Sequence, residues 1–88
     1  MLPEQYEKAR LKLQKIYHTN VHIKQARRMN LIFNQKRFIY YVSLQLDRHN
    51  FTITIPEFND WLDIVIHICD CITHELAHYY SHERDMFS

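Results

Sequence analysis

The chain has 88 residues, and none of them is glycine. Glycine takes positive φ values at no steric cost, so without it tight turns are expected to use Asn or Asp. The same absence excludes the glycine-rich loops that bind phosphate groups. The turns of the fold are therefore expected at Asn and Asp residues.

Length and composition define the class of protein. Hydrophobic residues make up 47% of the chain, which predicts one small domain over residues 1–88 with a single core. No apolar run is long enough to span a bilayer and no N-terminal stretch looks like a signal peptide, so we expect a cytoplasmic protein without a membrane partner. Cys69 and Cys71 would lie on opposing faces of a helix, and we expect both to be reduced.

Charge is divided along the chain. Residues 1–48 contain ten Lys/Arg against three Asp/Glu, a net charge of +7, and residues 49–88 contain one against seven, a net charge of −6. Such a division indicates either a basic surface for nucleic acid or, more commonly, solvated helix faces beside an acidic partner. The basic residues that would contact phosphates are Lys24, Arg27, Arg28, Lys36 and Arg37.

Residues 3–18 are predicted to form an amphipathic helix. Pro3 suits the first helical position, and acidic residues follow it at the positive end of the helix dipole. Thr19 and Asn20 are the predicted stop. One stripe is apolar and consists of Tyr6, Ala9, Leu13, Ile16 and Tyr17, while Lys8, Lys12 and Lys15 lie off it.

Residues 21–55 are expected to form strands, because apolar and polar residues alternate at 42–46 and 51–55. The four residues from Asp47 to Asn50 predict the turn of a hairpin between these two runs. An earlier turn is expected at 34–36. The stretch 24–33 fits helix or strand, and strand is the preferred interpretation.

The stretch from Phe58 to about Tyr80 contains no Pro or Gly and predicts a long, largely buried helix. The whole chain is therefore expected to be α+β: an N-terminal helix, a small antiparallel sheet of about three strands, and a long C-terminal helix. The apolar residues at helical spacing in this stretch are Trp61, Leu62, Val65, Ile68, Cys69, Ile72 and Leu76.

That helix carries the segment His74-Glu75-Leu76-Ala77-His78. Residues four apart lie on one helix face, about 6 Å from each other, so the two imidazoles can bind one zinc ion. Glu75 lies beside that face and can polarise a zinc-bound water. The spacing predicts a zinc hydrolase or a protein derived from one.

The segment 72–79, Ile-Thr-His-Glu-Leu-Ala-His-Tyr, resembles the active-site helix of the zincin metallopeptidases. The order helix, strands, helix resembles the SprT-like branch, whose best-known relatives cut proteins crosslinked to DNA. Short phage and bacterial peptidases of the ImmA type are similar in the motif. The resemblance implies that His74 and His78 bind zinc, that Glu75 is the general base, and that the substrate is a protein or peptide.

The chain departs from these families at the third zinc ligand, since a catalytic zinc normally has three protein ligands and one open position. SprT-like proteins take the third from a His ten or more residues past the motif, and this chain has ten residues after His78. The metzincin pattern would place Gly and His where this chain has Ser81 and Arg84.

His82 is the nearest candidate for the third ligand. On a continuous helix it lies about 12 Å along the axis from His74, so it can serve only if the helix breaks after Tyr79. Glu83 and Asp85 depend on the same condition. Three explanations stay open: the tail folds back, a partner chain supplies the ligand, or the sequence is a fragment.

Other residues near the motif have two interpretations each. Asp70 is four residues before His74 and either orients its second ring nitrogen or faces solvent. Tyr79 and Tyr80 either line the cleft or belong to the core. The row of His67, Cys71, His74 and His78 allows a different metal site, but the preferred interpretation makes Cys71 a core residue and gives His67 a hydrogen bond.

Three functions follow in order of preference. The first is a zinc-dependent metallopeptidase whose extended substrate lies along the edge strand at 51–55. The second is a catalytically incomplete zincin-like module for binding or assembly, with or without structural zinc. The third is a nucleic-acid-associated protein that uses the basic first half of the chain.

Overall fold

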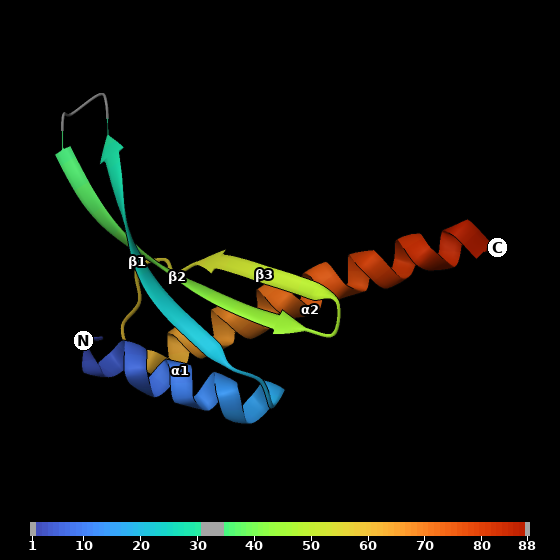
Figure 1. Cartoon of the computed structure of the whole chain (residues 1–88), viewed down its shortest axis with the longest axis horizontal. Coiled ribbons are helices and arrows are strands. Elements are labelled where there is room, and N and C mark those ends of the chain that lie inside the picture. The colour runs from blue at the N-terminus through green and yellow to red at the C-terminus, as the bar shows by residue number, and fades with distance from the viewer. Residues whose placement is uncertain (1, 31–34, 88) are drawn as a thin grey trace.

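The computed structural model describes the backbone of residues 2–30 and 35–87 and the side chains of 2–27 and 39–82. Two helices and three strands follow one another along the chain (Figure 1). The α+β prediction is confirmed in class and in element order. The elements are α1 (Glu4–Tyr17), β1 (Val21–Asn30), β2 (Gln35–Leu46), β3 (His49–Thr54) and α2 (Trp61–Phe87).

Helix α1 is shorter than predicted by one residue at each end. Pro3 is the N-cap residue rather than the first helical one. The helix ends at Tyr17 because His18 adopts a left-handed conformation with φ 53°, and its N–H donates to the carbonyl of Gln14. A histidine thus takes the position where glycine is usual, so the expectation that only Asn or Asp would serve such turns is wrong here.

The three strands form one antiparallel sheet in the order β1-β2-β3. The hairpin turn between β2 and β3 has two residues, Asp47 and Arg48, rather than four, because His49 already pairs with Leu46. Asp47 has φ 53°, as the first position of such a turn requires. The earlier turn predicted at 34–36 overlaps β2, which begins at Gln35, and 31–34 lie outside the described residues.

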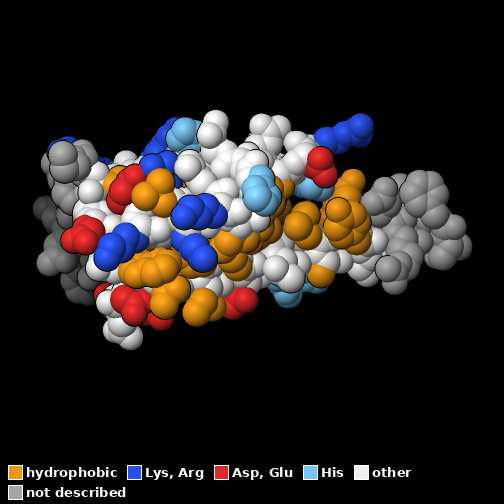
Figure 2. Space-filling model, turned by 90° about the horizontal axis from the view of Figure 1, so that it is seen from below, with side chains coloured by type: hydrophobic (Ala, Val, Ile, Leu, Met, Phe, Trp, Pro, Cys, Tyr) orange, Lys and Arg blue, Asp and Glu red, His pale blue; other side chains and the backbone are white. Residues whose placement is uncertain are grey.

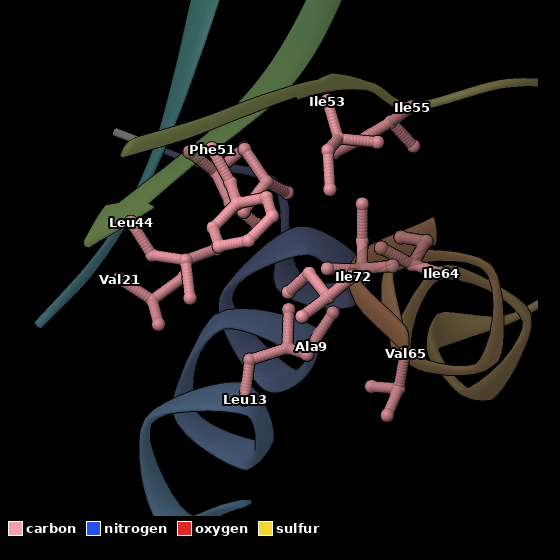
Figure 3. Close-up of a cluster of buried hydrophobic side chains, with 13 residues drawn as sticks. Ala9, Leu13, Val21, Leu44, Phe51, Ile53, Ile55, Ile64, Val65 and Ile72 are labelled. Atoms are coloured by element: carbon pink, nitrogen blue, oxygen red, sulfur yellow. The ribbon is translucent and has the colours of Figure 1, made fainter. Parts of the chain in front are cut away.

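Both helices pack on one face of this sheet, and the core lies between the two layers. Figure 3 shows Phe51, Ile53 and Ile55 pointing from the β3 segment toward the helices. Leu13 of α1 and Ile72 of α2 complete the contact from the other side. The part of the chain whose side chains are described has no buried polar or charged residue, so the core is held by apolar packing alone.

Helix α2 begins at Trp61, three residues later than predicted, because two carboxylates cap it there. The Asp60 carboxylate accepts hydrogen bonds from the backbone N–H groups of Leu62 and Asp63, at 2.8 and 3.3 Å. The Asp63 carboxylate in turn accepts from the N–H groups of Asn59 and Asp60. This reciprocal capping box satisfies donors that a helix start leaves free.

Only the first half of α2 is part of the core. Burial ends at Ile72, Leu76 is half-buried, and residues 77–82 are exposed. The prediction of a largely buried helix is therefore wrong for the second half of α2, which carries the His74–His78 segment and extends past the sheet (Figure 1). The radius of gyration is 15.3 Å, whereas a compact chain of this length would have about 12 Å.

The outer side of the helical layer is partly hydrophobic. Figure 2, seen from below, shows hydrophobic side chains at the surface among charged ones. Leu11 and Ile16 of α1 and Leu62 and Ile66 of α2 are exposed. Ile16 and Leu62 are therefore not part of the buried helix faces to which the sequence pattern assigns them. Across the described residues, no helix combines the length and the apolar character that crossing a membrane needs.

Candidate metal centre

His74 and His78 converge on one side of the projecting half of α2. Their Nε2 atoms are 3.0 Å apart, and both side chains are exposed. A contact of this length needs a hydrogen on one of the two nitrogens, which a metal ion would replace. In a tetrahedral site with Zn–N distances of about 2.0–2.1 Å, two ligand nitrogens lie about 3.3–3.4 Å apart. The pair therefore fits two positions of a zinc site with a slight widening.

Glu75 faces a different neighbour from the two histidines. It lines a hollow of about 370 Å³ beside the beginning of β3. Among the described strands β3 pairs with β2 alone, so this hollow lies at the edge strand of the sheet. The other residues lining the hollow are Arg48, His49, Asn50, Phe51 and Leu76.

The residues that the β2–β3 turn brings to Glu75 were not predicted from the sequence. A four-residue turn would have left His49 and Asn50 in a loop, whereas the two-residue turn makes both part of β3. The sequence signal that could have located His49 and Asn50 is Asp47, because Asp tolerates the positive φ that the first position of a two-residue turn requires.

Tyr79 contacts the sheet through one ring. It packs edge-on against the ring of His49, with centroids 4.4 Å apart, and edge-on against Tyr80 at 5.5 Å. Tyr79 is 45% exposed and Tyr80 is 55% exposed, so neither is a core residue. Tyr79 thus contacts a residue that lines the hollow but does not line it itself, and the cleft position of both tyrosines stays a prediction.

No third ligand joins the histidine pair within the part of the chain whose side chains are described. The described residues contain no group of three His, Cys, Asp or Glu side chains that could hold one metal ion. Helix α2 continues to Phe87, so the break after Tyr79 on which His82 depends does not occur. His82 thus stays about 12 Å along the axis from His74. The side chains of Glu83 and Asp85 lie outside the described part of the chain.

A second pair precedes the motif on the same helix. His67 Nε2 and Cys71 Sγ are 3.6 Å apart, and both side chains are half-buried. Cys71 packs against the core, and His67 has the hydrogen-bonding partner that the sequence analysis expected. Cys69 and Cys71 are both free thiols, as predicted.

Asp70 and Cys69 lie toward α1 rather than toward the His74–His78 pair. Burial raises the pKa of Tyr17, with further contributions from a hydrogen bond to Cys69 and from the charges of Cys69 and Asp70. Asp70 is exposed, and the hydrogen bonds of the described residues include none that its carboxylate accepts from His74. Its role in orienting His74 stays a prediction.

The five basic residues predicted to contact phosphates lie on β1 and β2. Lys24 and Arg27 are exposed on β1. The register places Arg28 opposite Arg37 and places Lys36 opposite Met29. The side chains of Arg28, Lys36 and Arg37 lie outside the described part, so their contact with nucleic acid stays a prediction.

Comparison with known proteins returns no relative: no protein-family profile, no curated protein and no solved structure matches this chain. The function proposed below therefore rests on the geometry of α2 and β3.

Proposed function

We propose that the protein is a zinc-dependent hydrolase of peptide bonds, of the zincin type. The observation that supports this most directly is the 3.0 Å convergence of the His74 and His78 nitrogens on the helix whose Glu75 lines the hollow at β3. A metal-binding pair, an acid–base group and a free strand edge thus occur together. Such a hydrolase needs each of these parts together with a third zinc ligand.

Each part has a role in the proposed reaction. When bound, zinc would lower the pKa of water and polarise the peptide carbonyl. Glu75 takes the proton of the attacking water and passes it to the leaving amine. The free backbone edge of β3, His49–Thr54, would pair with an extended substrate as an added strand. Free thiols at Cys69 and Cys71 support a reducing compartment such as the cytoplasm.

A second candidate function is a zincin-like module for binding or assembly that does not catalyse hydrolysis. It is favoured by the two-ligand site, since the described residues supply no third ligand. In that case zinc would be structural, and a partner chain would complete its coordination.

Replacing Glu75 by Gln tests the catalytic role. We expect Glu75→Gln to lower hydrolysis of an unfolded protein such as casein by about 100-fold or more, because proton transfer is lost. Zinc content, measured by mass spectrometry of the metal, should stay unchanged. The matched control is Glu57→Gln, an exposed glutamate away from the motif, which should keep full activity.

The metal itself is tested by a second pair of variants. We expect zinc near one per chain in the wild-type protein and its loss in His74→Ala. His22→Ala, which removes an exposed histidine on β1, is the control that should retain it. Full hydrolysis by Glu75→Gln would refute the catalytic role, and a zinc-free wild-type protein would refute both candidate functions that use zinc.

A further inference from the structure

Helix α2 carries two metal-binding pairs in one row. His67 and Cys71 form the first, with Nε2 and Sγ 3.6 Å apart, and His74 and His78 form the second, with Nε2 atoms 3.0 Å apart. Each member of the first pair is seven residues before a member of the second. Seven residues turn a helix to within about 20° of the same direction, so both pairs share one side of α2.

Each pair is half of a closed zinc site. Structural zinc takes four ligands in tetrahedral geometry, and Cys and His are its usual ligands. The two pairs lie about 10.5 Å apart along the axis, so they cannot share one ion. Among the described residues neither pair finds a third ligand. His74 and His78 are exposed, and His67 and Cys71 are half-buried, so a second helix can reach the row.

We propose that a second copy of this chain completes both sites by placing its α2 antiparallel along this row. In an antiparallel pair of identical helices, the numbers of any two residues that face each other add to the same total. His67 and His78 add to the same total as Cys71 and His74, so one alignment sets His67 opposite His78 and Cys71 opposite His74. A two-fold axis that crosses the helix pair at the level of the Ile72–Thr73 peptide bond therefore sets the His67–Cys71 pair of each copy opposite the His74–His78 pair of the other.

The two resulting sites are identical, and each has three imidazoles and one thiolate. Cys71 binds as the thiolate and releases its proton to solvent. The antiparallel arrangement also places the projecting half of each α2 beside the core-packed half of the other, whereas a parallel arrangement would bring both folded bodies to the same level. Antiparallel helix dipoles attract each other.

This inference rests on zinc binding by His74 and His78 in the proposed function, but not on hydrolysis. A zinc ion with four protein ligands has no open position for water. In this dimer, hydrolysis therefore requires water to displace one of the four protein ligands from the zinc.

Sedimentation and metal analysis of the purified full chain test the dimer. We expect a dimer with one zinc per chain, which becomes a monomer after treatment with EDTA. Cobalt in place of zinc should give a near-ultraviolet charge-transfer band from the Cys71 thiolate. Cys71→Ser should lose that band and the dimer, and His67→Ala should lose the dimer. Cys69→Ser is the matched control and should keep both.

The outcomes separate this inference from the proposed function. Glu75→Gln should form the dimer like the wild-type protein, because Glu75 is not one of the four ligands. A zinc-loaded monomer, a dimer that survives EDTA, or a folded Cys71→Ser dimer, with folding checked by circular dichroism, would overturn the inference. A zinc-linked dimer without hydrolysis in any form would uphold it and refute the hydrolase.

Discussion

Leu13 and Leu11 show that the position of a side chain on α1 decides how much it contributes to the stability of the fold. Leu13 is 0% exposed and packs between the sheet and α2, while Leu11 is 46% exposed on the outer side of the same helix. Burial of a leucine side chain contributes about 1.5–3 kcal/mol. The same residue type therefore stabilises the fold at one position and has little effect two positions earlier.

We expect Leu13→Ala to lower the free energy of unfolding by about 2–5 kcal/mol, because it leaves a cavity in the core. Leu11→Ala should change it by less than about 0.5 kcal/mol, as an exposed substitution. Urea unfolding followed by circular dichroism measures both. Similar losses in the two variants would contradict the packing of α1 described above.

Among the described residues, His18 and Asp47 have positive φ and show what the absence of glycine requires. Asp tolerates the left-handed region through its short polar side chain, and the turn at Asp47 was predictable for that reason. Histidine is also among the residues enriched at positive φ, but less specifically a turn residue than Asp or Asn, so the left-handed end of α1 at His18 was harder to predict.

At the scale of elements, the start of α2 depends on its capping box. Asp60→Ala removes the acceptor of two backbone hydrogen bonds. We expect it to lower the free energy of unfolding by about 1 kcal/mol, within a range of 0.5–2. Asp70→Ala is the control, since Asp70 is exposed and lies inside the same helix. An equal effect of both in urea unfolding would rule out a capping role for Asp60.

The existence and order of the elements were predictable because their apolar periods differ, two in the strands and close to four in the helices. The residues at which the elements begin and end were less predictable. The sequence of Asn59, Asp60 and Asp63 does contain the capping signal, yet the apolar Phe58 before it suggests an earlier start. The exposure of His74 was not predictable, because the apolar pattern of α2 continues past the point where the sheet ends.

At the scale of the whole molecule, α2 is supported along half its length. Residues up to Ile72 pack against α1 and the sheet, and beyond it the described contacts are those of Leu76 with the core and of Tyr79 with His49. Stability against local opening follows the density of such contacts. The two halves of one continuous helix should therefore open with different free energies.

Hydrogen exchange measures this difference. We expect backbone amides at 65–72 to be protected to nearly the global free energy of unfolding, and those at 76–82 to exchange much faster. Zinc should slow exchange around His74 and His78, because it links successive turns. Magnesium is the control and should have no effect, since it prefers oxygen ligands. Uniform protection along α2 without metal would contradict the described burial.

The separation within α2 has a consequence for how this protein changes over generations. Substitutions from Thr73 to His82, other than at His74, Glu75 and His78, meet few of the constraints that the core places on Ile64, Ile68 and Ile72. New ligands or new contact surfaces can thus arise at the far end of the helix while the fold stays intact. One half of the helix is constrained by folding, and the other only by the residues of the proposed site.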